Sequence, residues 1–313
     1  MGKIAFIFPG QGSQYVGMGK DFFHTFPESK MVFELANEFL NMNLSTICFE
    51  GSQEELTKTE NTQPAILATS LAIMKALEKA GIDCEYTAGL SLGEYTALVK
   101  SKALRFEDAI KLVRIRGKLM QEAVPEGKGT MAAILGLGRD KVLMAVEKAR
   151  GPYIVEVANF NSPEQIVITG EKEGVIRACE KALELGAKKI IPLSVSGPFH
   201  SSLLKPAGER LREELDKVQV FGLEKKFISN VDGKLVTDKE EVRDKLVRQV
   251  SSSVLWQDSI ELMIKEGVNT FIEIGPGKSL TGFVKRIGKY MNADIKTFNI
   301  NNIETFNKTL ASI

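Results

Sequence analysis

The fold class follows from one short stretch, EYTAGLSLGEY at residues 85–95. Residues 85–88 are predicted to form a short buried strand, and a helix is predicted to start near Gly93. The turn between them, Gly89-Leu90-Ser91-Leu92-Gly93, fits the pattern G-x-S-x-G, whose glycines permit a tight, strained bend. A strand, a sharp turn and a helix in this order are typical of an α/β protein with a mostly parallel sheet.

The segments on both sides of this stretch extend the same pattern. Residues 64–80 have strong helical periodicity and are followed by Gly81 as a C-cap, and a second helix is predicted over 106–123. Further apolar runs, each bounded by turn residues or alternating with helices, are predicted strands of the same sheet. These strands cover residues 3–8, 226–230, 270–274 and 295–300.

The chain changes character at Gly129. The predicted elements that follow are a strand at 130–135, a helix at 140–149, strands at 154–159 and 165–169, a helix at 174–185 and a strand at 189–193. The order βαββαβ defines the ferredoxin-like split unit. We therefore expect a discontinuous large α/β domain over residues 1–127 and 196–313, with a small ferredoxin-like subdomain over 128–195. The cleft between two such domains is a usual place for a small-molecule site.

The composition excludes several classes of protein. The 313 residues carry 41 Lys and Arg against 40 Asp and Glu, so the formal net charge is only +1. This balance argues against nucleic-acid binding, which needs clustered positive charge. The 3 Cys are too few and too widely spaced for a disulfide framework or a zinc site. No apolar run is long enough for a secretory signal or a membrane span. We expect a soluble, cytoplasmic protein with no metal.

Ser91 has two interpretations. It is a nucleophile raised out of the sheet, with backbone N–H groups of the next helix facing a developing oxyanion, or it is a capping serine in an ordinary glycine-lined turn. A nucleophilic serine needs a base. The chain has only 2 His, His24 and His200. His24 falls inside an amphipathic helix, whereas His200 falls in the loop that closes the small subdomain, so we predict His200 as the base.

Arg116 occupies a core-facing position on the helix predicted over 106–123. The apolar stripe of that helix comprises Ala109, Leu112, Val113 and Met120. A buried guanidinium is unfavourable without an anionic partner. That partner is either an internal Asp or Glu, or the carboxylate of a substrate held in a bidentate clamp.

Two glycine-rich segments do not match nucleotide-binding motifs. In residues 8–14 the third glycine of G-x-G-x-x-G is missing, and in residues 275–279 the first glycine of a P-loop is replaced by Ile272. Nucleotide binding is therefore not expected. Gly10-Gln11-Gly12 is better interpreted as a loop that brings backbone N–H groups close to a site, or as an ordinary turn that ends a strand.

Taken together, these motifs closely resemble the malonyl-CoA:acyl carrier protein transacylase family, the acyltransferases that load malonyl groups in fatty acid synthesis. The resemblance covers nearly the whole chain in order. It is carried by FPGQGSQ (8–14), GLSLGEY (89–95), the residues around Arg116, NFNSP (159–163), GPFH (197–200) and EIGPGKSL (273–280). The fold it implies is a hydrolase-like α/β core with a mostly parallel sheet and a ferredoxin-like insert.

The resemblance implies a two-step, ping-pong reaction. Ser91, activated by His200, would take the malonyl group from coenzyme A and pass it to the phosphopantetheine thiol of an acidic, transiently bound acyl carrier protein. Coenzyme A thioester is then a substrate, and no permanently bound cofactor is expected. The other implied roles are oxyanion binding by the N–H groups of Gln11 and Leu92, carboxylate binding by Arg116, orientation of the base by the carbonyl of Gln249, pocket lining by Asn159 and Asn161, and a size gate against branched acyl groups at Phe199.

Carrier-protein docking calls for a local basic surface even at a net charge near zero. The candidate pairs are Lys188-Lys189, Lys225-Lys226 and Lys285-Arg286. The sequence departs from many members of the family at Leu90, where they have His, and we expect that histidine to be dispensable.

The sequence leaves two other functions open. One is a serine hydrolase, such as a thioesterase or esterase, and the other is a non-catalytic binding module. Arg116 discriminates against the first, because hydrolases of apolar esters have no use for a cationic anchor. Loss of malonyl transfer in a Ser91→Ala variant would discriminate against the second.

Overall fold

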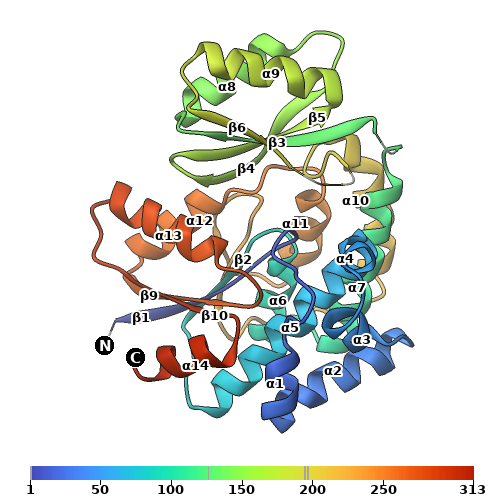
Figure 1. The fold of residues 1–313 in the computed structure, drawn as a ribbon, viewed down its shortest axis with the longest axis vertical. Helices are drawn as coiled ribbons and strands as arrows, with labels where there is room; N and C mark the ends of the chain where they lie inside the picture. Colours follow the sequence, from blue (N-terminus) through green and yellow to red (C-terminus); the bar gives the residue numbers. More distant parts are fainter. Residues whose placement is uncertain (1, 126, 194, 196) are drawn as a thin grey trace.

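The computed structural model describes residues 2–125, 127–193, 195 and 197–313, which form two sheets covered by helices (Figure 1). The larger sheet has the strand order β10-β9-β1-β2-β7-β8. Its strands are β1 (Lys3–Phe8), β2 (Tyr86–Gly89), β7 (Lys226–Ile228), β8 (Leu235–Val236), β9 (Val268–Ile274) and β10 (Lys296–Ile300). All neighbours are parallel except β7 and β8. The expected mostly parallel sheet of an α/β protein is confirmed.

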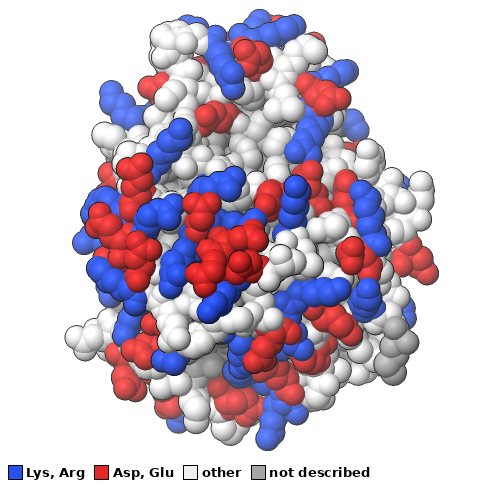
Figure 2. Space-filling model, turned by 180° about the vertical axis from the view of Figure 1, so that it is seen from behind, with Lys and Arg blue, Asp and Glu red and all other residues white. Residues whose placement is uncertain are grey.

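The central strand β1 shows why this sheet is apolar. Its residues 5–8 are fully buried, as expected where helices cover both faces of a parallel sheet. Phe6 and Phe8 pack into the core on one face, and Ala5 and Ile7 pack into the core on the other. On the rear face of the molecule, charged side chains of both signs are interspersed (Figure 2).

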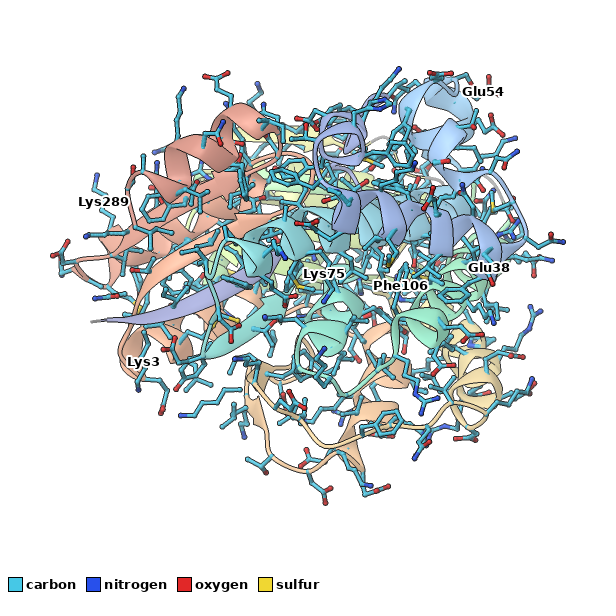
Figure 3. The ribbon with its side chains drawn as sticks, turned by 90° about the horizontal axis from the view of Figure 1, so that it is seen from below. Lys3, Glu38, Glu54, Lys75, Phe106 and Lys289 are labelled. Carbon is cyan, nitrogen blue, oxygen red and sulfur yellow. The ribbon has the colours of Figure 1, made fainter. Side chains whose placement is uncertain are left out.

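Helices cover both faces of the larger sheet. One core contains residues of α1 to α7, α10 and α11, and the other contains residues of α12 and α13. Seen from below, Glu38 of α2 and Glu54 of α4 lie on one side of the molecule and Lys289 of α13 lies on the other (Figure 3). These helices are α1 (Lys20–Thr25), α2 (Pro27–Leu40), α3 (Leu44–Phe49), α4 (Gln53–Thr57), α5 (Thr59–Lys79), α6 (Gly93–Lys100), α7 (Phe106–Glu122), α10 (Lys205–Leu215), α11 (Glu241–Gln249), α12 (Trp256–Lys265) and α13 (Ser279–Tyr290); α14 (Ile303–Leu310) follows β10.

The smaller sheet is antiparallel and has the order β4-β5-β3-β6. Its strands are β3 (Gly129–Leu135), β4 (Val155–Ser162), β5 (Gln165–Glu171) and β6 (Lys189–Pro192), and it packs against α8 (Arg139–Ala149) and α9 (Lys172–Glu184). The six elements predicted for this region are all present in the predicted order.

The edge strand β4 joins the smaller sheet to the rest of the molecule. The N–H of Phe160 donates to the carbonyl of Val254 (3.0 Å), and the N–H of Val254 donates to the carbonyl of Ala158 (2.8 Å). The next residue, Leu255, donates its N–H to the carbonyl of Asn230 (2.8 Å), just after β7, so residues 254–255 link β4 to the larger sheet through backbone hydrogen bonds. This connection places the end of β4 beside the carboxyl ends of the parallel strands.

One prediction needs correction, and one strand was missed. The helix predicted over 64–80 begins at Thr59, so Pro64 lies inside α5 although it has no N–H for the helical ladder. Tertiary burial compensates, because residues 61–74 are all buried. The two-residue strand β8 was not predicted, since so short a strand has no periodicity to detect. Ser196, where the second part of the large domain was predicted to begin, lies outside the described residues.

None of the helices within the described ranges is long and apolar enough to cross a membrane.

Candidate active site

The turn between β2 and α6 holds Ser91 in a left-handed backbone conformation, with φ at 52°. Only glycine fits two positions before and two positions after Ser91. A Cβ at Gly89 would lie 1.9 Å from the carbonyl carbon of Gly93, and a Cβ at Gly93 would lie 2.1 Å from the carbonyl oxygen of Phe8. The backbone N–H of Ser91 donates to Oδ1 of Asn230 (2.7 Å), which ties the strained turn to the end of β7. The predicted strand–turn–helix is therefore the observed local structure.

His200 approaches Ser91 directly, with 2.8 Å between Nε2 and the Ser91 Oγ. The other ring nitrogen, Nδ1, lies 2.9 Å from the backbone carbonyl of Gln249. A carbonyl only accepts, so Nδ1 carries the proton and Nε2 is left as the acceptor for the serine hydroxyl. His200 itself has φ at 61°, a second strained residue at the same site.

The environment of His200 favours its neutral form. Burial, together with the positive charge of Arg116, lowers the pKa of the imidazole to about 4. The ring is therefore an unprotonated base at neutral pH. His24, the other histidine, is exposed at the end of α1 and contacts the ring of Phe23 at 5.3 Å between centroids. It does not line the cavity that contains Ser91.

Arg116 is 1% exposed and lies against Ser91. Its Nη1 donates to Oε1 of Gln63 (2.8 Å), and its Nη2 donates to Oε1 of Gln249 (2.8 Å) and to the Ser91 Oγ (3.1 Å). No Asp or Glu of the described chain forms an ion pair with this guanidinium, so the internal acidic partner considered from the sequence is not in direct contact. Its Nε is buried without a hydrogen-bond partner. Such a cation has donor capacity to spare for an anionic ligand.

A cavity of about 580 Å³ brings the predicted residues together. It opens between the carboxyl ends of the parallel strands and the smaller sheet. The predicted site residues in its wall are Gln11, Ser91, Arg116, Asn159, Asn161, Phe199 and His200. Leu90 lines it as well, so the position where a histidine was expected by resemblance contributes an apolar surface. Leu92 and Gln249 lie behind this wall, fully buried.

The backbone N–H groups of Gln11 and Leu92 have no hydrogen-bond acceptor among the described residues. Gln11 follows β1, and Leu92 follows Ser91 at the start of α6. Gly10, next to Gln11, packs closely on the turn formed by residues 89–93, the elbow that carries Ser91: a Cβ at Gly10 would lie 2.5 Å from the carbonyl oxygen of Leu90. Both unused donors therefore belong to backbone segments that meet at Ser91.

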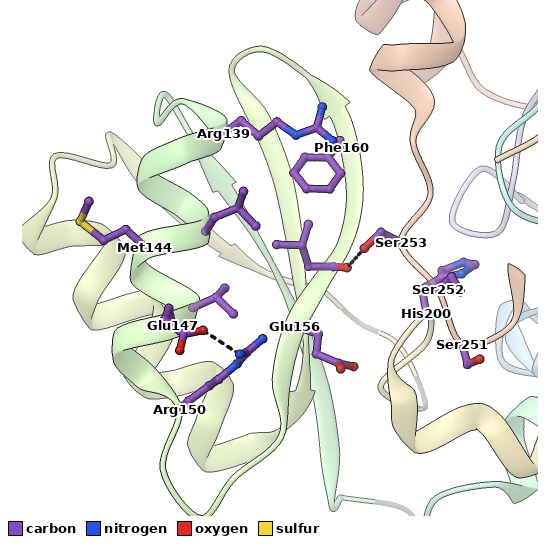
Figure 4. A pocket seen from close by; sticks show the side chains of 13 residues that line it. Arg139, Met144, Glu147, Arg150, Glu156, Phe160, His200, Ser251, Ser252 and Ser253 are labelled. Atoms are coloured by element: carbon purple, nitrogen blue, oxygen red, sulfur yellow. Dashed lines mark hydrogen bonds and ion pairs between the residues drawn. The ribbon is translucent and has the colours of Figure 1, made fainter. Parts of the chain in front are cut away.

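A second hollow of about 820 Å³ lies on another side of His200, between α8, β4 and residues 251–253 (Figure 4). Its cations are already paired. Arg139 forms an ion pair with Asp258 at 2.9 Å and stacks on Phe160, and Arg150 pairs with Glu147. Because Ser91 and Arg116 are absent from its wall, the larger hollow is not the candidate active site.

Sequence reasoning missed three residues of the site: Gln63, Glu94 and Asn230. Glu94 is fully buried in the first turn of α6, where an acidic residue ordinarily indicates a solvated helix start. Asn230 follows the short strand β7, and the rule that parallel strands meet at their carboxyl ends could have found it. Gln63 carried no signal, because a polar residue near a helix start is usually exposed.

No group of three His, Cys, Asp or Glu side chains in the described ranges is arranged to hold a metal ion. The polar atoms of the cavity are a hydroxyl, an imidazole, a guanidinium and amides, a set suited to an acyl group that carries a carboxylate rather than to a cation.

Comparison with known proteins identifies the family of the chain. A profile of the acyl transferase domain matches residues 5–301. The malonyl CoA-acyl carrier protein transacylase of Bacillus subtilis is 48% identical over 314 residues, which cover 100% of this chain and 98% of that protein. The Escherichia coli K12 protein of the same name is 45% identical over 288 residues, with 92% of this chain and 93% of that protein covered.

Solved structures agree with the sequence relatives. The malonyl CoA-acyl carrier protein transacylase of Clostridium perfringens superposes with a TM-score of 0.95 at 47% identity, covering 99% of this chain and 96% of that one. A malonyl-transacylase solved in complex with a type II PKS acyl-carrier protein gives a TM-score of 0.95 at 40% identity, covering 99% and 100%. The chain therefore belongs to the malonyl CoA-acyl carrier protein transacylase family of acyl transferases.

Proposed function

We propose that this protein transfers the malonyl group of malonyl-CoA to the phosphopantetheine thiol of an acyl carrier protein through an ester on Ser91. One observation carries the proposal: a serine on a strained turn touches both a neutral imidazole, at 2.8 Å, and a buried guanidinium, at 3.1 Å. The imidazole serves acyl transfer in general, whereas the guanidinium serves an acyl group with a carboxylate. The substrates named for the relatives are malonyl-CoA and acyl carrier protein.

In the first half-reaction the Ser91 Oγ attacks the thioester carbonyl while His200 Nε2 takes the hydroxyl proton. The carbonyl oxygen becomes an oxyanion, and the free N–H groups of Gln11 and Leu92 are the donors that stabilise it. Collapse of the tetrahedral intermediate breaks the C–S bond. His200 then returns its proton to the departing thiolate, so coenzyme A leaves as a thiol and the malonyl ester stays on Ser91.

The second half-reaction reverses these roles with a different thiol. The phosphopantetheine thiol gives its proton to His200 and its sulfur attacks the ester carbonyl. The same oxyanion donors act, the C–O bond to Ser91 breaks, and His200 reprotonates the serine. The carbonyl of Gln249 accepts the hydrogen bond from Nδ1–H throughout and so orients the ring, and no third acidic side chain is required.

Arg116 selects the acyl group by its charge. The malonyl carboxylate takes hydrogen bonds from the guanidinium, including the Nε that now has no partner. The positive charge of Arg116 disfavours protonation of His200. The negative charge of a bound malonyl carboxylate offsets it, so substrate binding raises the pKa of His200 and makes it a stronger base. Asn159 and Asn161 orient the acyl group, and Phe199 limits its branching.

The position of the basic pairs favours docking of the carrier protein at Lys285-Arg286. This pair lies on α13, whose Ser279, Leu280 and Phe283 line the cavity. Lys225-Lys226 instead begins β7, at the amino ends of the parallel strands, where Lys225 pairs with Asp83. An acidic partner is steered by local positive potential near the site it must reach.

Charge reversal tests this surface. A Lys285→Glu, Arg286→Glu variant is expected to lose turnover with carrier protein and to keep acylation by malonyl-CoA, while Lys225→Glu changes neither. Equal loss with both substrates would contradict docking at α13. Lys188-Lys189 lies at the start of β6, whereas the cavity-lining residue Leu193 follows the other end of that strand. Reversal of the charges of this pair serves as a second comparison.

The finer description of the fold follows from the same resemblance. The larger sheet and its helices correspond to a hydrolase-like core over 1–127 and 196–313, and the strand order β4-β5-β3-β6 supports a ferredoxin-like subdomain over 128–195. We place the reaction in the cytoplasm, where it supplies fatty acid synthesis.

Mass spectrometry provides the decisive experiment. Brief mixing with malonyl-CoA is expected to leave a malonyl adduct on the peptide that contains Ser91, and Ser91→Ala is expected to abolish both adduct and transfer. Transfer to carrier protein should exceed hydrolysis of malonyl-CoA. Dominant hydrolysis would make the protein a thioesterase, and intact transfer in Ser91→Ala would make the nucleophile assignment wrong.

A further inference from the structure

Glu94 is a buried carboxylate with no direct cationic partner. It is 0% exposed, and no Lys, Arg or His of the described chain forms an ion pair with it. Its Oε1 accepts the backbone N–H of Asn230 at 3.0 Å, and its Oε2 accepts the side-chain amide of Gln249. Burial raises the pKa of this carboxyl to about 7. Removing an unpaired carboxylate from water costs free energy, so a buried group of this kind usually has a specific role.

The contacts of the Gln249 amide fix its orientation. Nε2 faces two acceptors, the Glu94 carboxylate and the Ser91 carbonyl oxygen at 2.8 Å. Oε1 faces a donor, Nη2 of Arg116, at 2.8 Å. Above its pKa of about 7 the Glu94 carboxyl is ionised and only accepts, so an amide turned by 180° would place oxygen against oxygen at Glu94 and N–H against N–H at Arg116.

The same amide determines where Arg116 points. With Oε1 as its partner, Nη2 is held at 3.1 Å from the Ser91 Oγ, at the wall of the cavity. The backbone carbonyl of Gln249, in contrast, belongs to the last residue of α11 and holds His200 independently of the side chain. Loss of the amide orientation would therefore disturb the guanidinium more than the base.

We propose that Glu94 is a positioning residue for acyl-group selectivity: through the side-chain amide of Gln249 it aims Arg116 at the carboxylate of the acyl group. The proposal rests on the carboxylate-binding role of Arg116 given above. Glu94 does not touch the substrate. Its negative charge also offsets the buried guanidinium across one neutral amide, without occupying the donors that the acyl carboxylate needs.

Glu94→Gln tests the proposal with little change of volume. The new amide carries one acceptor and one donor where the site requires two acceptors. The backbone N–H of Asn230 cannot rotate away, so the new oxygen stays with it and the new NH2 faces Gln249. The Gln249 amide then turns, and Arg116 loses its acceptor.

The expected result is a selective loss. At pH 8, where Glu94 of the unaltered protein is ionised, Glu94→Gln is expected to raise KM for malonyl-CoA about 10-fold or more while kcat changes less than about 3-fold, as for a lost contact in binding. Acylation of Ser91 by acetyl-CoA, which has no carboxylate, changes little. The malonyl-to-acetyl ratio of kcat/KM therefore falls about 10-fold. Equal loss for both thioesters, or no loss, would overturn the proposal.

Glu273→Gln is the matched control. Glu273 is also 0% exposed and accepts hydrogen bonds from Leu280 and Thr281, but it contacts none of Ser91, Arg116, His200 or Gln249. Its substitution is expected to lower thermal stability without changing the malonyl-to-acetyl ratio. A ratio that falls equally in both variants would mean that any buried carboxylate has this effect, and the proposal would fail.

A double-mutant cycle adds a test that does not depend on one variant. Gln249→Met removes the amide and keeps the backbone carbonyl, so it should lower the malonyl-to-acetyl ratio as Glu94→Gln does. If Glu94 acts through this amide, Glu94→Gln has no further effect on the ratio in the Gln249→Met background. Additive effects would contradict the relay. The adduct on Ser91 of the unaltered protein separates this outcome from failure of the proposed function itself.

Discussion

The junctions β2–α6 and β9–α13 are built from similar elements but have different roles. Each has a parallel strand, a glycine-rich turn and a helix, and each contains a fully buried glutamate, Glu94 or Glu273. Burial raises the pKa of both carboxyls. Within the part of the chain that the structure describes, Glu273 accepts only from its own junction, at the N–H groups of Leu280 and Thr281 and the hydroxyl of Thr281.

Glu94 instead bonds groups far away in the sequence. Its partners Asn230 and Gln249 are separated from it by 136 and 155 residues. A carboxylate with local partners caps a helix, whereas a carboxylate with distant partners couples separate segments of chain around Ser91. The difference indicates that the β9–α13 junction is mainly structural and the β2–α6 junction is functional.

The largest effect is expected where the elbow itself is broken. In Gly93→Ala the new Cβ would overlap the backbone oxygen of Phe8, which cannot move without moving β1. We expect a loss of more than about 3 kcal/mol in the free energy of unfolding, or no folded protein. Chemical denaturation measures it. Gly138→Ala, which meets nothing within 4 Å, is the control and should change little. A folded, active Gly93→Ala protein would contradict the packing of the elbow.

Removing the base leaves the elbow intact and should remove the chemistry. His200→Ala is expected to lower transfer about 10²- to 10⁴-fold, the usual contribution of a general base. Single-turnover acylation of Ser91 measures it, with His24→Ala as the control. Because the pKa of His200 is lowered to about 4, the unaltered protein should keep its base as the pH falls to about 5. Acylation of Ser91 by acetyl-CoA does not depend on Arg116 or Glu94, so an acetyl-CoA activity that declines already with a midpoint near 6.5 would contradict the buried, neutral imidazole.

Removing the anchor should affect only acyl groups with a carboxylate. Arg116→Ala is expected to lower kcat/KM for malonyl-CoA about 10- to 100-fold, as for a lost charged hydrogen bond. The kcat/KM for acetyl-CoA should fall much less. Arg114→Ala on the same helix is the control, since Arg114 donates to the Leu40 carbonyl, at 3.4 Å, and does not line the cavity that contains Ser91. Unchanged selectivity in Arg116→Ala would remove the carboxylate clamp from the mechanism.

The smallest effect concerns stability and pH at Glu94. Its pKa is 4.5 in an ordinary environment and about 7 in the fold, so between these values the native state binds more protons than the unfolded state. Its contribution to stability is therefore present below pH 4.5 and is lost as the pH rises through 7. Glu94→Gln cannot titrate, so its melting temperature relative to the unaltered protein should be higher at pH 8 than at pH 5. A relative melting temperature that is the same at both pH values would show that the carboxyl titrates normally.

Parts of this site were predictable because they depend on neighbouring residues. The spacing of two glycines around Ser91 restricts the backbone to the strained turn, and a histidine count of two leaves few candidates for the base. The position of Arg116 follows from the 3.6-residue period of its helix. The six-element order of the smaller sheet was predictable for the same reason, since periodicity changes from helix to strand are local.

Other parts were not predictable, because they depend on contacts between distant segments. Glu94 resembles an ordinary acidic residue in a first helical turn until Asn230 and Gln249 close over it. Gln63 is a polar residue near a helix start until Arg116 reaches it. The partner of Arg116 could not be chosen from the sequence, and the structure supplies amides instead of an acid.

The sequence by itself determined the nucleophilic turn, the available bases and the side of the helix on which Arg116 lies, because steric exclusion at glycine and helical periodicity act over a few residues. Only the tertiary structure decided which donors and acceptors meet at Ser91. The direction of a guanidinium or an amide depends on the groups opposite it, and here those groups come from α5, α6, α7 and α11.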